Sequence, residues 1–467
     1  MADHFRVLIV GGSVAGLSFA HCLERLGISY TILEKGDKIA PQLGASIGIL
    51  PNGGRILDQL GLFDAVEKEI DPLEVAKIRY PNGFGFGSQY PRTLHSAFGY
   101  PVSFLERRRF IQILYDKLKS KACVHVKKEV VSITNSQSGA VVRTADGSVY
   151  EADLVVGADG VHSVVRSEIW RCFTSASHLP TVTGRSTDGI KYEYSCIYGI
   201  SMDVPNVRLG VQLSLLDDGM SLHVFTGKDG KLFWFLIFKN LYDGSFSNQN
   251  RSVDSARSIC EGLQSRKVSD DLSWKEIWSR CTIWKMTPLE EGVFRQWNYG
   301  RLVCIGDAVR KMAPNIGQGA NMAIEDAAKL ASLLHGRFPL GGLSISEIDS
   351  ILHEFVAARK PRSASMCSQS EFLVRMQANQ GWGRRLLGRY LIPLLKDGPS
   401  SFSGLSISGA EKLDFLDLPT RSLKGPWDTS WLSVVQSGVS LRPRIGQYQY
   451  AACFAVAFFV LFLAKLR

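Results

Sequence analysis

The sequence predicts an α/β fold in which two segments of a parallel-sheet domain flank an inserted segment of antiparallel strands. Three observations lead to this prediction. A strand, a glycine-rich turn and a helix open the chain, two later buried strands each end in a glycine–acid stretch, and further strands lie between those two. The 467 residues are enough for a large core and two domains.

Residues 5–34 are typical of a Rossmann-type βαβ unit that binds a dinucleotide. The order is strand, turn, helix and second strand: Arg6–Val10, then Gly11, Gly12 and Gly16, then Leu17–Leu26, then Tyr30–Leu33. The glycines let the backbone turn tightly against a pyrophosphate, whose charge the helix N-terminus attracts.

Glu34 lies 18 residues after Gly16, at the end of the second strand. A carboxylate there can accept hydrogen bonds from the ribose hydroxyls of an adenosine. The strict G-x-G-x-x-G pattern would place a glycine at position 13, where this chain has Ser13. The motif alone therefore leaves open a dinucleotide site and a plain turn.

Two further stretches place an acid at the end of a buried strand. The first runs from Val156 to Gly160 with Asp159 in it and continues to Arg166, and the second is Gly306–Ala308 with Asp307 in it. Ligands of open α/β sheets bind at such carboxyl ends, so we expect these stretches to meet the N-terminal turn. Asp159 and Arg166 have an alternative role, which is to hold their own loop in place.

The texture of the sequence divides the chain into six parts. The predicted boundaries are 1–170 and 299–340 for the two parts of the nucleotide-binding domain, 171–298 for the sheet-rich domain, 341–398 for a helical region, 399–444 for a linker and 445–467 for an apolar end. Aromatic side chains in the sheet-rich part, among them Tyr198 and Phe235, are expected either to wall an apolar substrate pocket or to pack the sheet.

Several elements follow from local patterns. We predict strands at 207–216, 222–226 and 231–238, a helix at 103–118, a loop or short hairpin at 81–98, and a basic helix at 371–395. The last lies either on a membrane surface or with its basic face in water. The 399–444 segment, rich in Ser, Gly and Pro, is predicted to be a loop or linker.

Composition limits the partners. The net charge of +10 suits anionic cofactors and anionic membrane surfaces. No RNA-binding motif and no zinc-ligand spacing occurs, so we expect no nucleic acid and no metal. Nine scattered cysteines without a C-x-x-C pair indicate reduced thiols inside a cell, and no secretory signal is expected before the first strand.

The C-terminal segment is predicted to be a membrane helix. Residues 445–464 carry no charge, and arginines or a lysine flank them on both sides. The strictly apolar part, Tyr450–Ala464, would be about 22 Å long as a helix and reaches across a bilayer only together with its uncharged flank. The alternative is a buried C-terminal helix.

Taken together, GGSVAG at 11–16, ADGVHSVVR at 158–166 and GDAVRKMAPNIGQGANMAIEDA at 306–327 resemble FAD-dependent monooxygenases of the aromatic-hydroxylase type. The resemblance covers roughly residues 5–335. It is strongest to fungal membrane-anchored enzymes that epoxidise prenyl chains in terpenoid and meroterpenoid (including indole-diterpene) biosynthesis. It implies a Rossmann-type FAD-binding domain, an inserted antiparallel-sheet substrate domain, a helical C-terminal region and a C-terminal membrane helix.

The resemblance also implies roles for residues at the adenosine end of FAD. Gly11, Gly12 and Gly16 would form the phosphate turn, and Glu34 would hold the ribose. Asp159 and Gly160 would touch the pyrophosphate and the nicotinamide cofactor.

At the flavin end, Gly48 would lie against the ring side, Asp307 would bind the ribityl hydroxyls, and Gly319 and Ala320 would face the isoalloxazine with their N–H groups. The arginine that reaches the FAD would be Arg107, or Arg108 or Arg109 if the register is shifted.

By this resemblance the enzyme would use FAD and O₂, with NADPH as a transient co-substrate, and epoxidise a hydrophobic prenylated substrate through a flavin C4a-hydroperoxide. Tyr198 would orient or proton-couple the distal oxygen, the alternative being a core tyrosine. The protein would be anchored in the endoplasmic reticulum membrane through its C-terminus, with the catalytic domain in the cytosol.

Two other functions stay open. The same motifs serve aromatic (phenol) hydroxylases, and the pocket alone separates the two reactions. A non-catalytic binder similar to prenyl-protein escort proteins would keep the fold without flavin chemistry, although the intact GDA and GQGAN stretches speak against it.

Overall fold

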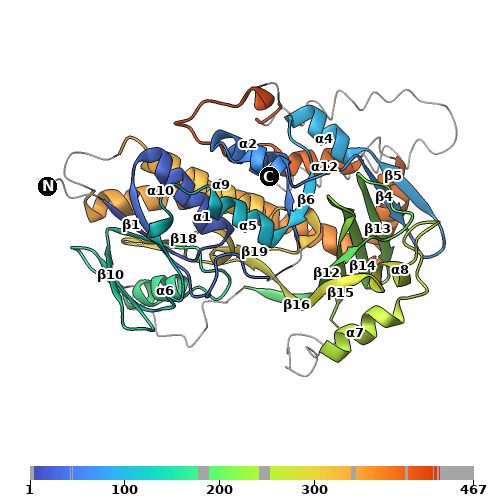
Figure 1. Ribbon diagram of the computed structural model, residues 1–467, viewed down its shortest axis with the longest axis horizontal. Coiled ribbons are helices and arrows are strands. Elements are labelled where there is room, and N and C mark those ends of the chain that lie inside the picture. Colours follow the sequence, from blue (N-terminus) through green and yellow to red (C-terminus); the bar gives the residue numbers. More distant parts are fainter. Residues whose placement is uncertain are drawn as a thin grey trace.

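The computed structural model describes residues 5–42, 44, 46–176, 189–240, 253–337, 343–394, 398–423, 425–428 and 431. Its described part contains a six-stranded sheet and an eight-stranded sheet, with smaller sheets of three and two strands. Figure 1 shows the two large sheets side by side, the six-stranded one at the left and the eight-stranded one at the right.

The N-terminal βαβ unit forms as predicted. It consists of β1 (Arg6–Val10), α1 (Val14–Leu26) and β2 (Ser29–Leu33). Helix α1 ends at Gly27, whose φ of 70° gives the left-handed turn that releases the chain into β2. Strand β1 pairs in parallel with β2 on one side and with β11 on the other, so its apolar run is buried.

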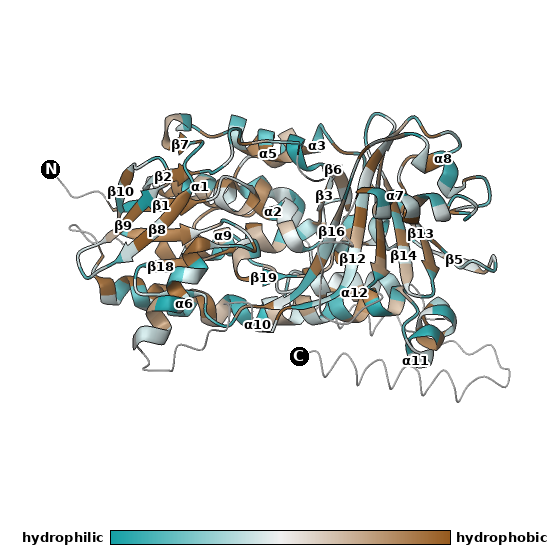
Figure 2. Ribbon diagram, turned by 90° about the horizontal axis from the view of Figure 1, so that it is seen from below, coloured by the Kyte–Doolittle hydropathy of each residue, from teal (hydrophilic) through white to brown (hydrophobic). Residues whose placement is uncertain are grey.

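The six-stranded sheet has the order β17-β18-β11-β1-β2-β7. The strands not yet given are β7 (Val124–His125), β11 (Leu154–Gly157), β17 (Asn298–Tyr299) and β18 (Leu302–Cys304). The chain leaves this sheet after β11, forms strands β12 to β16 of the second sheet, and returns at β17 and β18. Figure 2 shows these central strands in the colour of hydrophobic residues, as a sheet covered on its faces requires.

Helices cover this sheet. α1 packs on α9 (Gly319–Leu334), and α6 (Val164–Ala176) lies against β11 and β18. The helices α2 (Pro51–Gln59), α3 (Phe63–Glu67) and α5 (Arg107–Asp116) complete the layer around α9 and α1. The smaller sheets are β3 (Ser46–Ile49) with β6 (Ser103–Glu106), and β8 (Val130–Asn135) with β9 (Ala140–Thr144) and β10 (Val149–Ala152).

The eight-stranded sheet has the order β19-β16-β12-β15-β14-β13-β4-β5. Its strands are β4 (Val75–Arg79), β5 (Gly85–Ser88), β12 (Lys191–Met202), β13 (Val211–Asp217), β14 (Met220–Thr226), β15 (Lys231–Lys239), β16 (Cys281–Val293) and β19 (Arg310–Lys311). β4 and β5 lie in the segment that was predicted to be the first domain. They nevertheless belong to this sheet, because β4 pairs in parallel with β13, which is far away in the sequence.

The two faces of the larger sheet have different neighbours. One face packs Trp234 against Trp274 of α8 (Trp274–Trp278), beside α7 (Val253–Gly262). The other face carries Phe225 and Phe235 toward the helices of the C-terminal region. It is this second face that borders the cavities described below.

The C-terminal region is helical. α10 (Ile345–Gln377) is 33 residues long and contacts both large sheets, through β17 at one and through β14 and β16 at the other. It is followed by α11 (Trp382–Leu386), one π-helical turn at Leu387–Leu391, a 3-10 turn at Ile392–Leu394 and α12 (Gly398–Ile407). Short 3-10 turns elsewhere lie at Lys121–Cys123, Gly306–Ala308, Pro314–Ile316 and Thr420–Ser422.

Three predicted elements were wrong. The helix expected at 103–118 begins only at Arg107, because Ser103–Glu106 pairs with β3 as a strand. The loop or hairpin expected at 81–98 forms only in its first part, where β5 pairs with β4; its second part is α4 (Tyr90–Phe98), whose Leu94 and Phe98 are buried. The linker expected at 399–444 begins with α12, which packs Ile407 into the core beside α4.

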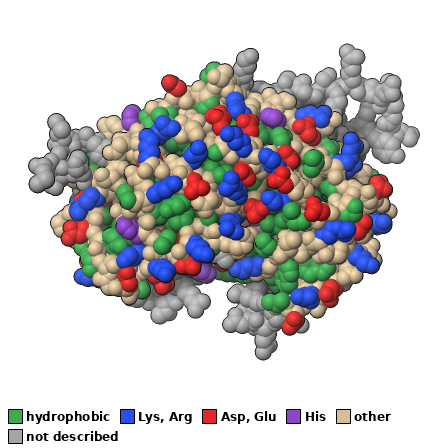
Figure 3. Space-filling view, in the orientation of Figure 1, with side chains coloured by type: hydrophobic (Ala, Val, Ile, Leu, Met, Phe, Trp, Pro, Cys, Tyr) green, Lys and Arg blue, Asp and Glu red, His purple; other side chains and the backbone are tan. Residues whose placement is uncertain are grey.

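Lys and Arg side chains alternate with Asp and Glu over the face drawn in Figure 3. In the part of the chain that is described, no helix has the length and apolarity needed to cross a membrane. The predicted anchor at 445–467 lies outside the described residues.

Candidate functional site

A cavity of about 630 Å³ lies where the parallel strands end. β1, β2, β11 and β18 all run in the same direction, and the residues just beyond their carboxyl ends line it: Gly11, Glu34, Asp159 and Asp307. The three glycine–acid stretches of the sequence therefore meet in one place. Arg107, Gly160, Gly319 and Ala320 line the same cavity.

The glycines of the N-terminal turn act mainly by letting backbones approach. Gly11 has a φ of +106°, and a Cβ on it would lie 2.5 Å from the carbonyl oxygen of Ala158. A Cβ on Gly16 would lie 2.0 Å from the carbonyl oxygen of Gly11. Gly12 and Gly16 are not among the residues that line the cavity, so these two shape the turn from behind.

The carboxylate of Glu34 is tied to two backbone turns. Its Oε2 accepts a hydrogen bond of 2.8 Å from the Gly12 N–H, and its Oε1 accepts one of 2.8 Å from the Gly36 N–H. These bonds fix the side chain at the cavity wall, while each carboxylate oxygen keeps a further lone pair for a ligand hydroxyl.

The structure separates the three arginines of residues 107–109. Arg107 lines the cavity and donates from Nη2 to the Ser13 Oγ over 2.8 Å. Arg108 bonds to Gln42 and Arg109 pairs with Glu69, and both of these arginines are exposed. Burial lowers the pKa of Arg107, and the charges of Asp307 and Glu34 oppose that shift. Ser13, which replaces the expected glycine, is thus a hydrogen-bond partner of Arg107.

Asp307 forms an ion pair with Lys311, whose Nζ lies 2.9 Å from Oδ2. Desolvation by the surrounding protein opposes ionisation of Asp307, although about half of its side chain is accessible, and the charges of Lys311, Arg310 and Arg107 lower its pKa below the usual range. Asp307 is therefore an anion at neutral pH, able to accept hydrogen bonds from hydroxyl groups.

Asp159 and Arg166 both hold loops in place. Asp159 Oδ2 accepts from the N–H of Val164, at the start of α6, over 2.7 Å. Arg166 donates to the carbonyl oxygen of Ala308 over 2.9 Å, and its guanidinium lies 3.7 Å above the ring of Phe294. Arg166 thereby joins the second glycine–acid stretch to the third. Asp159 also lines the cavity, so only this one of the two has access to a ligand.

Two helix N-termini point at the cavity without an acid to neutralise them. Ser13, Val14 and Ala15 of the α1 start and Gly319 and Ala320 of the α9 start all line it. Neither helix has an acidic residue in its first turn or a side-chain cap. Their free N–H groups and dipoles favour negative charge in the ligand, so the donor set fits an anionic dinucleotide with a polyhydroxyl chain.

A second hollow of about 170 Å³ continues from this cavity, and both are lined by Asp307, Gly319 and Ala320. Gly48, Phe104, Phe235 and Lys311 also belong to its wall. We call it the connecting hollow. The predicted Gly48 thus lies here rather than in the main cavity, with Phe104 so close that a Cβ on Gly48 would meet the ring at 3.2 Å.

A third space, here called the apolar cavity, encloses about 160 Å³ and shares Phe104 and Gly317 with the connecting hollow. The sheet, α4, the end of α10 and α12 surround it, and its wall includes Ile78, Phe86, Leu216, Phe225, Leu373, Met376 and Phe402. No charged side chain is among the described residues of its wall.

Tyr198 lies on β12, next to Phe235 in the sheet register, with 6.4 Å between the two ring centroids. It is not among the residues that line these three spaces. Burial raises the pKa of Tyr198, and the charges of Arg107 and Lys311 offset this only in part. The structure thus places this tyrosine near the charged groups of the site but behind the wall.

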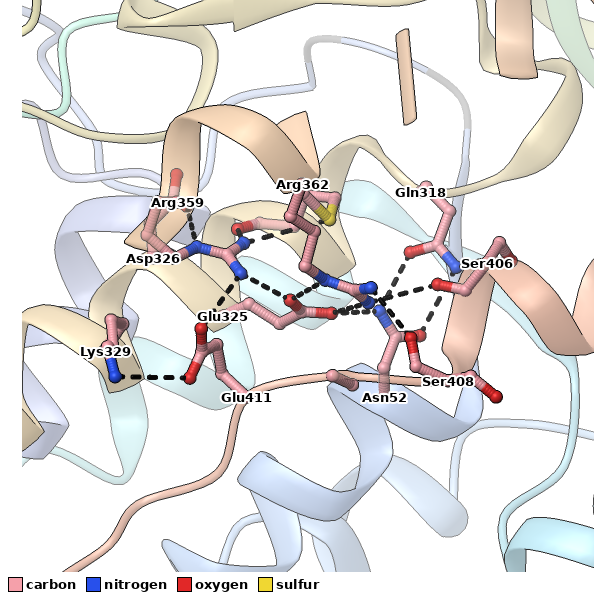
Figure 4. Close-up of polar contacts among 12 residues, drawn as sticks. Asn52, Gln318, Glu325, Asp326, Lys329, Arg359, Arg362, Ser406, Ser408 and Glu411 are labelled. Atoms are coloured by element: carbon pink, nitrogen blue, oxygen red, sulfur yellow. Dashed lines mark hydrogen bonds and ion pairs between the residues drawn. The ribbon is translucent and has the colours of Figure 1, made fainter. Parts of the chain in front are cut away.

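A polar network that sequence reasoning did not predict holds α9 (Figure 4). Glu325, fully buried, accepts from Arg359 and Arg362 of α10 over 2.8 and 2.7 Å, and from Asn52 of α2 over 2.7 Å. Asn52 also bonds to Gln318, the residue before α9, over 2.9 Å. Two adjacent acids, Glu325 and Asp326, inside a largely apolar helix were the available signal.

The network is ionised. Burial alone would raise the pKa of Glu325, but Arg362 and Arg359 lower it to about 2. Asp326 accepts from Arg359 over 2.9 Å and from Arg310 over 2.6 Å, so the second acid is paired as well. The N-terminus of α9, which faces the main cavity, is therefore fixed to α2 and α10 by buried charges.

A family model for the FAD binding domain matches residues 4–182 and 248–368, well over half of the chain. The chain belongs to this family, and FAD is its cofactor. Curated relatives narrow the class. The FAD-dependent monooxygenase ltmM of Epichloe festucae (strain Fl1) is 59% identical over 466 residues, which are 99% of this chain and 98% of the relative. The FAD-dependent monooxygenase idtM of Claviceps paspali is 60% identical, covering 96% and 91%.

This chain is thus an FAD-dependent monooxygenase, which favours an enzyme over the non-catalytic binder. Solved structures agree in fold. HpxO of Klebsiella pneumoniae, crystallised with FAD and uric acid, has a TM-score of 0.71 at 19% identity and covers 87% of this chain and 97% of its own. A salicylate hydroxylase–substrate complex has a TM-score of 0.64 at 19% identity, covering 87% and 99%.

Proposed function

We propose that the protein epoxidises an alkene of an uncharged prenylated intermediate, such as one on a terpenoid, meroterpenoid or indole-diterpene route. One observation carries this proposal: a charge-free apolar cavity continues through the connecting hollow into the cavity of Glu34, Arg107 and Asp307. A hydrocarbon guest gains burial in the first, while a charged cofactor is held in the last.

In this proposal Glu34 holds the adenosine ribose, Asp307 the ribityl hydroxyls, and Arg107 the phosphate region of FAD. Asp159 and Gly160 contact the pyrophosphate and NADPH, which visits as the reductant and leaves. The starts of α1 and α9 supply the N–H groups, and Gly319 and Ala320 place theirs where the main cavity meets the connecting hollow.

Bound FAD supplies the activation of dioxygen. The residues of the chain position the alkene and exclude water: Phe104 and Phe235 wall the connecting hollow, and Phe225 stacks on Phe104 with a centroid distance of 3.9 Å. An alkene needs no acid or base to be attacked by an electrophilic oxygen. We assign to Tyr198 only a proton-coupling role through Arg107 and Lys311, whose charges act on it.

Hydroxylation of a phenol is the second candidate, and Lys311 favours it. This lysine lines the connecting hollow, where a cation would stabilise a phenolate. Lys311 is already paired with Asp307, however, and the wall of the apolar cavity suits a hydrocarbon better than a phenol. Conversion of a geranylgeranylated aromatic substrate against a simple phenol, with FAD and NADPH supplied, separates the two reactions by product mass and position of oxidation.

We further propose that residues 445–467 anchor the enzyme in the endoplasmic reticulum membrane, with the catalytic part in the cytosol. The support is the uncharged sequence of 445–464 together with an exposed patch on α11 and the π-helical turn. There Trp382 is 82% exposed, Leu386 45% and Tyr390 52%, at helical spacing and among arginines. Leu387 and Gly388 of the same segment line the apolar cavity, so a substrate dissolved in lipid would enter nearby.

A further inference from the structure

The sheet wall of the apolar cavity carries a polar patch of three residues. Tyr90 Oη donates to Gln212 Oε1 over 2.5 Å, and Gln212 Nε2 donates to Ser214 Oγ over 3.2 Å. Tyr90 comes from the first turn of α4, while Gln212 and Ser214 are two residues apart on β13 and so point to the same face.

The chain of hydrogen bonds continues behind the wall. Ser214 Oγ lies 3.0 Å from His223 Nδ1, and His223 Nε2 lies 3.1 Å from Ser221 Oγ. Burial lowers the pKa of His223 to about 4, so the imidazole is neutral at physiological pH and carries a single N–H. The ring therefore donates in one of these two contacts and accepts from a serine hydroxyl in the other.

The members of this hydrogen-bonded row pair with one another, and replacing such mutually satisfied pairs by apolar groups of the same shape can be nearly neutral for folding. Elsewhere in the wall, Asn315 bonds to Gln377 over 3.3 Å, and Ser406 accepts from Gln318 over 3.2 Å. The patch of Tyr90, Gln212 and Ser214 is a continuous polar feature of the wall that is suited to a ligand.

The patch has unused hydrogen-bonding capacity. Gln212 donates one of its two amide hydrogens, and no described residue accepts the other. Tyr90 donates its only hydrogen and is left with lone pairs. One donor and one acceptor side by side match a hydroxyl group, which both accepts and donates. Because no described residue of the wall is charged, a charged head group would be left without a partner.

The sheet register places the patch at a fixed distance from the reacting end. Phe235 of the connecting hollow is paired with His223, and His223 with Ser214, in one row across the strands. Two strand spacings separate Phe235 from Ser214, roughly 10 Å. A substrate held at the patch therefore presents an alkene some way along its chain, rather than at its polar end, to the connecting hollow.

We propose that Tyr90 and Gln212 bind a single hydroxyl at one end of the hydrocarbon substrate and thereby select which double bond is oxidised. This rests on the proposed function, because it assigns an orientation to the guest of the apolar cavity. Ser214, His223 and Ser221 are positioning residues, since they act by fixing the Gln212 amide.

The test compares two ligands of the FAD-loaded full-length enzyme: geranylgeraniol, and the same hydrocarbon with hydrogen in place of the hydroxyl. Binding is followed by the change in flavin absorbance. We expect the wild-type enzyme to bind the alcohol roughly tenfold more tightly than the hydrocarbon. Tyr90→Phe and Gln212→Met are expected to reduce or abolish that preference. Tyr80→Phe, which removes a buried hydroxyl with no hydrogen-bond partner among the described residues, is expected to keep it.

Product analysis with NADPH gives an independent readout. The wild-type enzyme is expected to form one epoxide of geranylgeraniol, and Gln212→Met a mixture of positional isomers. Equal affinity of the wild-type enzyme for both ligands, or a single epoxide and an unchanged preference in both variants, overturns the inference while leaving the proposed function standing. Absence of any NADPH-dependent oxidation of prenylated substrates by the wild-type holoenzyme overturns the proposed function, and the inference with it.

Discussion

Arg107 combines a buried guanidinium, a hydrogen bond to Ser13 and a place in the wall of the main cavity. A charge-assisted bond to a phosphate contributes roughly 1.5–3 kcal/mol. We therefore expect Arg107→Ala to raise the Kd for FAD at least about tenfold, measured by fluorescence titration of the apoprotein. Arg108→Ala, one residue along and exposed, should bind FAD like the wild type. Equal affinities of the two variants would refute the assignment of Arg107.

A substitution at Gly319 can distinguish an effect on the space for FAD from an effect on the stability of the protein. A Cβ on it meets nothing within 4 Å because the residue faces the cavity at the start of α9. Alanine also favours a helix over glycine by up to about 1 kcal/mol. Gly319→Ala should therefore keep or raise the Tm of the apoprotein yet weaken FAD binding severalfold, because the methyl group occupies ligand space.

Gly262, at the end of α7, serves as the matched control for this substitution. A Cβ there also meets nothing within 4 Å. Gly262 is far in sequence from the residues that line the main cavity, and it belongs to α7, which lies beside the eight-stranded sheet. Gly262→Ala should leave the Kd for FAD unchanged. A Gly319→Ala variant with wild-type affinity would mean that the start of α9 does not face the cofactor.

At the residue scale, the sequence predicted the groups that follow strand ends. Glu34, Asp159 and Asp307 come directly or shortly after buried strands, and parallel strands bring such positions to one edge. The sequence did not predict the hydrogen bond between Ser13 and Arg107, since the two residues are far apart in the chain. Nor did it predict Asn52 and Gln318, because amides that pair across helices leave no local pattern.

At the element scale, α9 is the helix that the site depends on. Its start faces the main cavity, while Glu325 on its second turn is held by Arg359 and Arg362 of α10. Removing one partner of a buried ion pair leaves the other charge uncompensated. Glu325→Gln should therefore lower the free energy of unfolding by roughly 3–5 kcal/mol, measured by urea denaturation of the holoenzyme.

The matched control is Glu354→Gln on α10, where the ion pair with Arg337 at 2.9 Å has both side chains about half exposed. Such a pair contributes about 0–1 kcal/mol, so this variant should unfold close to the wild type. A Glu325→Gln variant as stable as Glu354→Gln would contradict the structural role of the network.

The same carboxylate predicts a pH dependence. The folded protein lowers the pKa of Glu325 from 4.5 to about 2, so the ionised form stabilises the fold above 4.5. That contribution is lost as the pH falls from 4.5 toward about 2. The difference in Tm between wild type and Glu325→Gln should be constant above pH 5 and shrink below it. A difference that grows on acidification would contradict this sign.

Elements with a strong local pattern were predictable, and those fixed by distant partners were not. The βαβ unit and the strands of the inserted sheet have the expected periodicity. Ser103–Glu106 is continuous in sequence with the helical pattern of apolar residues that follows it, but it pairs with β3 as a strand. α12 is rich in Ser and Gly, yet it forms a buried helix. Packing of α12 against α4 outweighs its weak helix propensity.

At the scale of the whole molecule, three spaces follow one another from the strand ends to the C-terminal helices. The cofactor end is polar and framed by helix starts, and the far end is apolar and enclosed by α4, α10 and α12. This order depends on β4 joining the inserted sheet and on α10 contacting both sheets. Neither contact follows from a local sequence pattern, so the sequence alone did not predict the path of the substrate.

The proposed anchor makes a prediction at the same scale. In cells, the full chain should remain in the membrane fraction after alkaline carbonate extraction. Phe458→Arg combined with Leu461→Arg should release it, because each charge in the hydrocarbon layer costs about 2.5–3.5 kcal/mol. Leu418→Arg, at an exposed position of the described part, is the control and should stay with the membrane. Retention of the double variant would rule out residues 445–467 as the anchor.

In the proposed reaction, a hydrocarbon guest of the apolar cavity receives an oxygen atom from dioxygen at the FAD. Turnover of a geranylgeranylated substrate by the full-length holoenzyme with NADPH under ¹⁸O₂, analysed by mass spectrometry, tests this step. We expect a product that carries one ¹⁸O across a former double bond of the prenyl chain. Label on an aromatic ring, or a product without label, would contradict it.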